Sequence, residues 1–460
     1  LPLPAVEGVC DLEIEAVERG GLRWSRTVAT RTVQVVAVDE RPAVADETPW
    51  SLVHEVDPGS PRLHERLRRL PAVGLPAMPL PPVSLPAMPF PSLSRPNVPL
   101  PKLPQVPVPP LPAVPSVASM VPRLSGLLAS GHSVIEPHAL GTMLRLPAAD
   151  DAAEPSWEGV VVVGVRPGMP HMVEVEYPSD QDAVIGLSVL ELDASERLVV
   201  PCHHGGFTVS KPQPYEMSEP RLETHRFVFW PTTRQPVILI SNPSVRSAAL
   251  LGKIRVLAGP SRLSAAPPAG VDAGRIGGIT DRRRVHGFLA EPDFPRFGGA
   301  TRMVRGVPRS VVDWQAQLDG MRHSAELLSA RAAGGAMVVV HSQGGSLWPS
   351  RLTMHAPRWS DPVAAEVGLD PAPKDMLAAL CRVYARAGLG LVPALSFDAP
   401  VPSLERRLAA GGADAVGIAC VGRDGQPLRL GTFGTVRYNI LDPRVQAAVE
   451  EQVRELAARV

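Results

Sequence analysis

A short apolar run, Ala336–Val340, lies between two helical patterns and constrains the fold more than any other feature of the chain. The run is rich in β-branched residues, follows a pair of glycines and precedes polar, glycine-rich chain. Such a run is typical of a strand that is buried on both faces of a sheet. Amphipathic periodicity over 311–332 and 371–387 places a helix on either side of it. We therefore expect a β/α repeat with a parallel sheet.

The same alternation continues through residues 285–460, which predict an incomplete parallel (β/α) barrel. The further elements are apolar runs at 285–294, 388–397 and 413–421, a short helix at Leu404–Ala410 and a last helix at Asp442–Val460 that starts with Asp-Pro. A doubly wound sheet is also compatible with this pattern. Three or four units in ~175 residues are well short of the ~250 that a full barrel takes. If the segment is a barrel, it contains only the first three or four units.

Upstream of residue 260 the pattern changes to that of an antiparallel sheet. Residues 141–259 contain many short apolar or alternating segments separated by Gly, Pro, Asn and Asp, without helical periodicity. This arrangement predicts a β-sandwich of the jelly-roll type. Alternating segments within 10–57 predict further strands with one solvated face. Whether those strands complete the same sandwich stays open at this stage.

Two linkers separate these parts. Residues 71–123 consist almost wholly of Pro, Leu, Val, Ala and Met, and proline at this density predicts an extended polyproline II spacer. A ligand for aromatic-groove modules is the alternative interpretation of that segment. The predicted organisation is N-terminal strands at 1–70, a proline-rich linker at 71–123, a β-sandwich at 141–259, a Gly/Pro/Arg linker at 260–284 and a partial barrel at 285–460.

Composition excludes several classes of partner. Lys plus Arg and Asp plus Glu both number 46, so no nucleic-acid partner is expected. No apolar run approaches the ~20 residues of a membrane-spanning helix. The four cysteines are far apart without C-x-x-C spacing, and the adjacent His203 and His204 would point to opposite faces of a strand. We therefore expect no metal and no cofactor.

The two chain ends and the assembly state are less informative. The chain begins with Leu1, and no basic-then-apolar leader precedes it, so we expect a cut or processed N-terminus. The compartment stays open, and a secreted or periplasmic location is compatible with the sequence. The oligomeric state is not determined by the sequence either.

Polar and aromatic residues follow the predicted parallel strands at the carboxyl ends, where α/β folds bind their ligands. The residues in question are Glu291 and Asp293 after the first strand, His341, Gln343 and Trp348 after the second, and Asp398 after the third. Polar groups for hydroxyls and an indole for a ring face would form a sugar-binding rim. The alternative for each residue is an ordinary solvated loop.

Aromatic residues of the predicted sandwich are a second set of candidates for sugar contacts. They are Trp157, Tyr177, Tyr215 and Trp230. Aromatic faces stack on pyranose rings, but an aromatic residue in a strand is more often part of the core. Core packing therefore stands as the alternative for each of the four.

The segment HSQGG at 341–345 is similar to the nucleophile elbow of lipases and esterases. That motif needs a small residue two positions before the serine and a helix directly after it. Val340 is β-branched, and Ser346–Pro349 cannot begin a long helix. The last histidine of the chain is His355, so no triad of the order Ser…Asp…His exists within it. A serine hydrolase that uses Ser342 is therefore the third alternative.

Several longer segments resemble a known group of proteins. HGFLAEPDFPRFGG, the helix-strand stretch VVDWQAQLDG…VVVHSQGGSLWPS, GLGLVPALSF and YNILDPRVQAAVEEQVRELAARV resemble large bacterial glycosyl hydrolase-like proteins that are similar to family 10 glycosylhydrolase-type (β/α)8 proteins. VEVEYPSD, THRFVFWP and GKIRVLAGP resemble the β-sandwich that precedes the barrel in them. The resemblance covers residues 141–460, and 10–70 more weakly.

This resemblance implies catalytic carboxylates on the fourth and seventh barrel strands, which would lie downstream of Val460. No catalytic residue is assigned for that reason. The sequence predicts the N-terminal portion of a glycoside hydrolase acting on a carbohydrate, with this chain alone inactive. The alternative is a non-catalytic carbohydrate-binding or cell-surface-binding protein.

Overall fold

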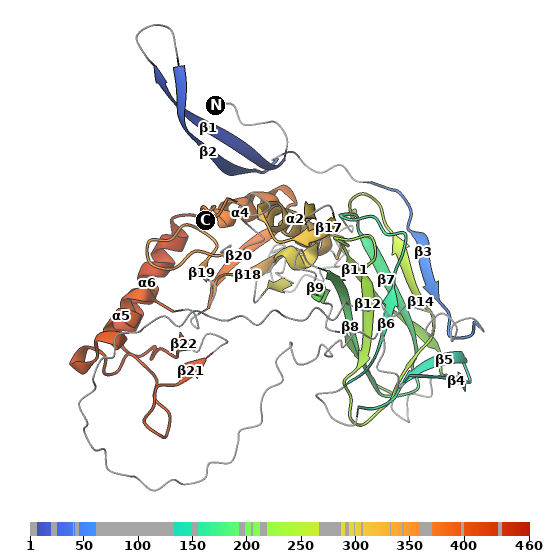
Figure 1. The fold of residues 1–460 in the computed structure, drawn as a ribbon. Coiled ribbons are helices and arrows are strands. Elements are labelled where there is room, and N and C mark those ends of the chain that lie inside the picture. The colour runs from blue at the N-terminus through green and yellow to red at the C-terminus, as the bar shows by residue number, and fades with distance from the viewer. Residues whose placement is uncertain are drawn as a thin grey trace, which may run out of the picture.

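Most strands of the described residues lie in antiparallel sheets, with a smaller α/β unit beside them (Figure 1). The computed structural model describes residues 7–19, 25–39, 41, 46–60, 133–149, 155–192, 198–203, 206–211, 219–265, 287–289, 294–298, 300–304, 307–331, 333–342, 345–357, 370–396, 400–430 and 435–460. The proline-rich segment 71–123 and residues 266–284 of the second linker lie outside the described residues.

Two antiparallel sheets face each other as a β-sandwich. The first has the strand order β10-β8-β12-β6 with β9 also paired to β8, and the second has the order β11-β7-β14-β3. A small third sheet, β13-β5-β4, lies beside them. The strands are β3 (Ser51–Val56), β4 (Val134–His138), β5 (Gly141–Leu146), β6 (Ser156–Val161), β7 (His171–Pro178), β8 (Ala183–Leu192), β9 (Leu198–His203), β10 (Phe207–Val209), β11 (Leu222–Phe229), β12 (Val237–Asn242), β13 (Ala249–Leu251) and β14 (Ile254–Ala258). The predicted β-sandwich is confirmed.

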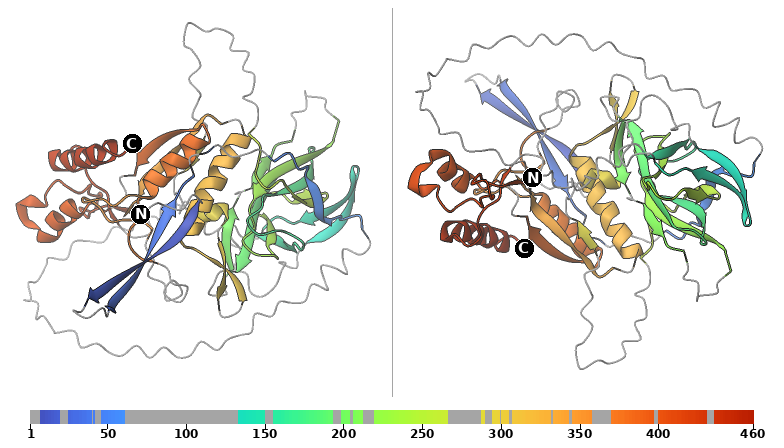
Figure 2. Two further views of the ribbon diagram at one scale, coloured as in Figure 1. Left: turned by 90° about the horizontal axis from the view of Figure 1, so that it is seen from above. Right: turned by 90° about the horizontal axis from the view of Figure 1, so that it is seen from below.

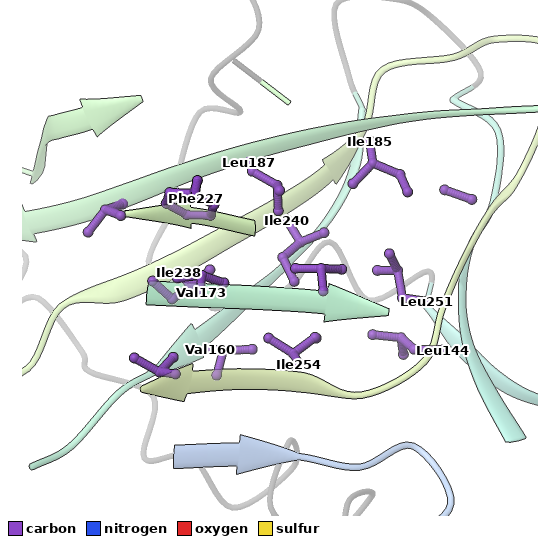
Figure 3. Close-up of a cluster of buried hydrophobic side chains, with 14 of the residues drawn as sticks. Leu144, Val160, Val173, Ile185, Leu187, Phe227, Ile238, Ile240, Leu251 and Ile254 are labelled. Carbon is purple, nitrogen blue, oxygen red and sulfur yellow. The ribbon is translucent and has the colours of Figure 1, made fainter. Parts of the chain in front are cut away.

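The sandwich core follows from the two-residue period of its strands. In β7, Val173 and Val175 are fully buried between the sheets, while Glu174 and Glu176 point outward. Figure 3 shows side chains from both sheets meeting in this apolar layer. On the outer face, Arg255 of β14 forms ion pairs at 2.8 Å with Glu55 of β3 and with Glu176. One face of this sheet is therefore apolar and the other is a lattice of cross-strand ion pairs.

The N-terminal strands divide between two structures. Strand β3 pairs antiparallel with β14 and becomes an edge strand of the sandwich. Strands β1 (Gly8–Arg19) and β2 (Ser25–Ala37) pair only with each other, as a two-stranded ribbon that extends away from the body (Figures 1 and 2). Only the last of the early segments thus completes the sandwich.

The α/β unit contains three parallel strands in sequential order. These are β15 (Gly287–Leu289), β18 (Gly335–Ser342) and β20 (Gly390–Leu395), with β18 in the middle. Helices α2 (Trp314–Ala330) and α4 (Met376–Arg386) pack on one face of this sheet, against Ala336, Val338 and Val340 of β18. The predicted alternation of parallel strands and helices is confirmed for these three strands and two helices.

A (β/α) barrel is not supported. The run at 413–421 does not join the parallel sheet but forms the short 3-10 helix η3 (Gly412–Asp414) and turns, in which Val416 is 73% exposed. The described residues contain three parallel strands and no closed barrel. The apolar residues at 413–421 alternate with Gly, Ala and Asp, so the run lacks the continuous apolar character of a buried strand.

The remaining elements are short or lie at the C-terminus. Helices α5 (Pro402–Ala410) and α6 (Pro443–Ala457) pack together through Leu404, Val445 and Ala448, and the Asp442 side chain caps α6 as the Asp-Pro pair predicts. The other elements are η2 (Phe294–Phe297), β16 (Ala300–Val304), β17 (Val307–Val311), β19 (Gly345–Ser346), β21 (Arg429–Leu430) and β22 (Thr435–Val436).

Helix α2 contacts both the sandwich and the other elements of the α/β unit. Its residue Gly320 lies so close to η2 that an added Cβ would fall 1.9 Å from the carbonyl oxygen of Phe294. One turn later, His323 stacks on Trp230 of the sandwich with ring centroids 4.5 Å apart, and its Nδ1 lies 2.7 Å from the carbonyl oxygen of Phe297. Both aromatic side chains are buried. The sandwich and the α/β unit therefore meet across this helix.

Replacing Gly320 tests this close approach, because tight packing and helix propensity predict changes of opposite sign in the free energy of unfolding. Gly320→Ala should raise helix propensity by ~1 kcal/mol, but overpacking against Phe294 should cost more, for a net loss of roughly 1–2 kcal/mol in the free energy of unfolding. Chemical denaturation measures this difference. Gly390→Ala is the control, because its Cβ would lie at an ordinary 3.5 Å from the Gly334 carbonyl oxygen. A stabilised Gly320→Ala variant would contradict the packing described here.

The buried imidazole at the joint should make stability depend on pH. Burial lowers the pKa of His323 to about 3, with Arg322 and Arg262 acting in the same direction. An unfolded histidine binds its proton below about pH 6.5, so between these values the unfolded state holds more protons. The free energy of unfolding should therefore fall as the pH decreases from about 6.5 towards 3, by up to about 1.4 kcal/mol per pH unit.

Urea unfolding at several pH values between 7.5 and 4.5 checks this expectation. His323→Phe keeps an aromatic ring against Trp230 and removes the titrating group, so its stability should change less steeply over this range. Other buried histidines such as His171 contribute to the pH dependence of both proteins, because burial lowers the pKa of His171 too. Equal slopes for the wild type and His323→Phe would exclude a role for His323.

Candidate functional site

Three half-buried aromatic rings gather at the side of the sandwich where β10 and β11 are edge strands. Tyr177 comes from β7, Phe207 from β10 and His225 from β11. The rings of Phe207 and His225 are stacked with centroids 4.1 Å apart, and Tyr177 is tilted against Phe207 at 4.8 Å. We refer to Tyr177, Phe207 and His225 as the edge aromatic cluster.

The position of the edge aromatic cluster follows from strand register. Tyr177 lies two residues beyond the buried Val175, and His225 two residues before the buried Phe227, so both point toward the interior. Strands β10 and β11 are the edge strands of their sheets on this side. Inward-pointing rings on edge strands close the core and still present part of their surface to solvent.

Glycine brings the third ring into place. Gly206 directly precedes Phe207 and has a φ of +88°, a conformation that L residues with a side chain rarely adopt. A Cβ at this position would lie 1.9 Å from the carbonyl oxygen of Ile185. Only glycine therefore lets the short strand β10 approach β8 closely enough to seat Phe207 between Tyr177 and His225.

Polar groups surround the edge aromatic cluster. The Tyr177 hydroxyl donates to Glu223 at 3.1 Å, and the Arg221 guanidinium donates to the other oxygen of that carboxylate at 2.9 and 3.1 Å. The backbone N–H of Lys211 donates to Asp182 at 2.8 Å on the loop beside β10. The site thus combines ring surface with a carboxylate and a guanidinium, both partly or largely exposed.

The charge states in the site follow from these contacts. Hydrogen bonds from Arg221 and Tyr177 lower the pKa of Glu223, so it is an anion at neutral pH. Burial and the Glu223 carboxylate raise the pKa of Tyr177, which keeps its hydroxyl protonated. Burial and the positive charge of Arg331 lower the pKa of His225, so its ring is neutral. The site offers a carboxylate acceptor, a guanidinium donor and uncharged ring faces.

The predicted rim at the carboxyl edge of the parallel sheet is only partly described. His341 is the last residue but one of β18. Its ring centroid lies 6.5 Å from that of Trp348, so the structure brings these two predicted residues together. Both are buried, at 2% and 1% exposure, and the Trp348 indole donates to Glu455 of α6 at 3.2 Å. Glu291, Asp293, Gln343 and Asp398 lie outside the described residues.

The chain after Ser342 does not have the form of a nucleophile elbow. Strand β18 turns back into β19, and Ser342 pairs with Gly345 in antiparallel register. Ser346, which would have to begin the helix, donates its hydroxyl to the Trp348 carbonyl oxygen at 2.8 Å. At Gly345–Ser346 the chain is strand β19, which pairs antiparallel with the end of β18.

The other aromatic candidates of the sandwich differ in their surroundings. Trp157 is 7% exposed and packs with Leu190 and Leu239, and Trp230 is 2% exposed under His323, so both pack as core residues. Tyr215 and His204 lie outside the described residues. Among the described residues, no group of three or more His, Cys, Asp or Glu side chains could hold a metal ion.

Sequence reasoning found Tyr177 but missed Phe207 and His225. Phe207 lies in a strand of three residues, too short for an alternation pattern. The Gly-Gly pair before it was the available signal, since glycine within a strand pattern indicates a close backbone approach. His225 alternates regularly with the core residues of β11, but only the tertiary pairing of β11 at a sheet edge makes it a site residue.

Comparison with known proteins gives matches only at the level of structure. No protein-family model matches the chain, and no curated protein matches it in sequence. A family 35 carbohydrate-binding module from Clostridium thermocellum matches with 13% identity over 28% of this chain and 90% of that one, at a TM-score of 0.21. A xylan-binding domain from Paenibacillus barcinonensis matches with 10% identity over 30% and 90%, at 0.22.

A third match is the enzymatically active domain of a tailspike protein from a bacteriophage. It has 11% identity and a TM-score of 0.20, and covers 28% of this chain but only 17% of the tailspike chain. The fold assignment made above therefore relies on the strand pairings of this chain itself. Within the described residues, no helix is both long and apolar enough to cross a membrane.

The role of Gly206 in building the site can be tested with a matched glycine. Gly206→Ala should displace β10 and separate Phe207 from His225, because its Cβ would overlap the Ile185 carbonyl oxygen. Gly168→Ala is the control, since Gly168 also has a positive φ (+76°) but nothing lies within 4 Å of an added Cβ. Both changes should cost roughly 1–2 kcal/mol of backbone strain. Only Gly206→Ala should remove the ring-current shift of the His225 proton resonances in NMR spectra.

Proposed function

We propose that this chain binds a carbohydrate, and that the edge aromatic cluster of the β-sandwich is the binding site. The observation that carries the proposal is the combination of Tyr177, Phe207 and His225, partly exposed, with Glu223 and Arg221 beside them. Sugar recognition needs apolar ring surface for the C–H faces of a pyranose and fixed polar groups for its hydroxyls. The edge aromatic cluster offers both within one small area.

The alternative is a purely structural role, in which these rings only close the hydrophobic core at the side of the sandwich. Two features favour a binding role. The guanidinium of Arg221 donates two hydrogen bonds to the carboxylate of Glu223, and a ring that merely closed the core would need no charged pair beside it. Tyr177 also turns its hydroxyl toward that carboxylate instead of toward water alone. Preorganised polar groups next to apolar surface are typical of ligand sites.

The predicted rim of the α/β unit is proposed as a second carbohydrate contact. Strands β15, β18 and β20 are parallel neighbours, and in the sequence Glu291, Asp293, Gln343 and Asp398 follow these strands within a few residues. His341 and Trp348 are buried there, so they would support the rim from beneath and leave direct contact to the loop residues. Hydrolysis of the bound carbohydrate, which the family resemblance implies, remains a prediction.

Titration with soluble oligosaccharides tests the binding proposal. Isothermal titration calorimetry of the full chain against xylo-, cello- and galacto-oligosaccharides should reveal saturable binding to at least one series. Phe207→Ala and Arg221→Gln should each weaken that binding at least tenfold, which corresponds to ~1.4 kcal/mol. Tyr177→Phe, which keeps the ring and removes the hydroxyl bonded to Glu223, should weaken it less than Phe207→Ala.

Arg226→Gln is the matched control for Arg221→Gln. Arg226 is an exposed arginine of β11 that is ion-paired to Glu174 on the outer face of the same sheet, away from the edge aromatic cluster. Its replacement should leave affinity unchanged. Binding that survives Phe207→Ala in a folded protein, or that is lost equally in Arg226→Gln, would place the sugar elsewhere and refute this site.

A further inference from the structure

The ribbon of β1 and β2 is a β-sheet with two free edges. The strands pair in antiparallel register from Gly8 with Ala37 to Arg19 with Ser25, and no other strand of the described residues joins them. The ribbon extends away from both the sandwich and the α/β unit (Figures 1 and 2). An isolated two-stranded ribbon is marginally stable in water, and an unpaired strand edge is a template for another strand.

The base of the ribbon is held firmly to the body. The Val9 N–H donates to the Gln315 side chain of α2 at 3.0 Å. Gln34 and Asp370 exchange two hydrogen bonds, from the Gln34 N–H to the carboxylate at 3.0 Å and from the Asp370 N–H to the amide oxygen at 3.1 Å. Lys374 is ion-paired with the same carboxylate. The ribbon is therefore a fixed projection with a defined direction.

The two faces of the ribbon differ in chemistry. Because side chains alternate, one face of β1 carries Cys10, Leu12, Ile14 and Ala16, and the facing residues of β2 include Val33 and Val35. Ile14 is 51% exposed although it is a large apolar residue. On β2 the same face carries one charged residue, Arg31, which is paired with Ile14. Exposed apolar surface of this kind marks an interaction site.

The opposite face of β1 is acidic. Asp11, Glu13 and Glu15 occupy successive positions on it, and the facing residues of β2 are Gln34, Thr32 and Thr30. Asp11 accepts a hydrogen bond from Gln34 at 3.0 Å, and neither Glu13 nor Glu15 is ion-paired with another of the described residues. Strand β2 contains no carboxylate anywhere in its thirteen residues. Negative charge is thus confined to the β1 side of the ribbon.

From this arrangement we propose that the free edge of β1 receives a strand of a partner protein in which basic and apolar residues alternate. The added strand extends the sheet by main-chain hydrogen bonds. Its apolar residues continue the face of Leu12 and Ile14, and its basic residues lie opposite Glu13 and Glu15 on the other face. A second copy of β1 would bring like charges together at this edge, which disfavours self-pairing there.

A synthetic strand tests the proposal on the full chain. The probe is an acetylated, fluorescein-labelled nine-residue peptide of alternating Val and Lys, and the control peptide has the same composition with the valines and the lysines in separate blocks. Fluorescence anisotropy should show saturable binding of the alternating peptide that is at least tenfold tighter than that of the block peptide. Hydrogen exchange should show slower exchange of β1 amides in the complex.

Matched variants distinguish the edge from general charge attraction. The double variant Glu13→Lys/Glu15→Lys and the single variant Ile14→Ser should each weaken binding of the alternating peptide at least tenfold. The control is Glu450→Lys/Glu451→Lys on the exposed side of α6, which makes the same change in net charge and should leave affinity unchanged. Circular dichroism spectra and thermal melts confirm that each variant is folded.

Three outcomes would overturn the proposal. The block peptide could bind as tightly as the alternating one, or the α6 variant could lose as much affinity as the ribbon variant, which would indicate charge attraction alone. Protection from exchange could be absent from β1. Light scattering could show a dimer that dissociates in the Ile14→Ser variant, in which case a second copy of this chain, and not a basic strand, covers the ribbon.

Discussion

The close contact of helix α2 with its neighbours is the constraint on which the rest of the structure depends. At Gly320 the backbone of η2 approaches the helix within a distance that excludes any side chain, and one turn later the neutral imidazole of His323 lies flat on Trp230. The N-terminal end of the same helix bonds to the ribbon through Gln315. The sandwich, the parallel sheet and the ribbon are thereby fixed to one element, and each presents its exposed edge in a defined direction.

The edge aromatic cluster and the ribbon both lie at sheet edges, and the reason is physical. The interior of the sandwich is filled by apolar side chains from both sheets, and its outer face is occupied by cross-strand ion pairs such as Arg255 with Glu55. At the side where β10 and β11 end their sheets, rings are only partly covered, and the outer edge of β1 pairs with no further strand of the described residues. Edges are where this β-rich protein retains unsatisfied surface.

The sequence predicted individual strands and helices well, but it predicted poorly which of them lie next to each other. The alternation in HMVEVEYP and the apolar run at 336–340 predicted β7 and β18, because burial on one face or on both leaves a direct trace in the residue pattern. The run at 413–421 misled the prediction of a further strand, since its small apolar residues suit a turn as well as a sheet. The predicted (β/α) barrel is not supported, and the described residues contain three parallel strands. Of the edge aromatic cluster, only Tyr177 was recognisable from the sequence.

The sequence by itself determined that a β-sandwich precedes parallel strands that alternate with helices, since two-residue and helical periods are local properties of the chain. Only the tertiary structure decided that β3 joins the sandwich while β1 and β2 stand apart, and that Phe207 meets His225. Those outcomes depend on which strands become neighbours across long stretches of chain. Pairing at that range is decided by backbone hydrogen bonds and by close approaches at glycines such as Gly206, and neither leaves a periodic signal in the sequence.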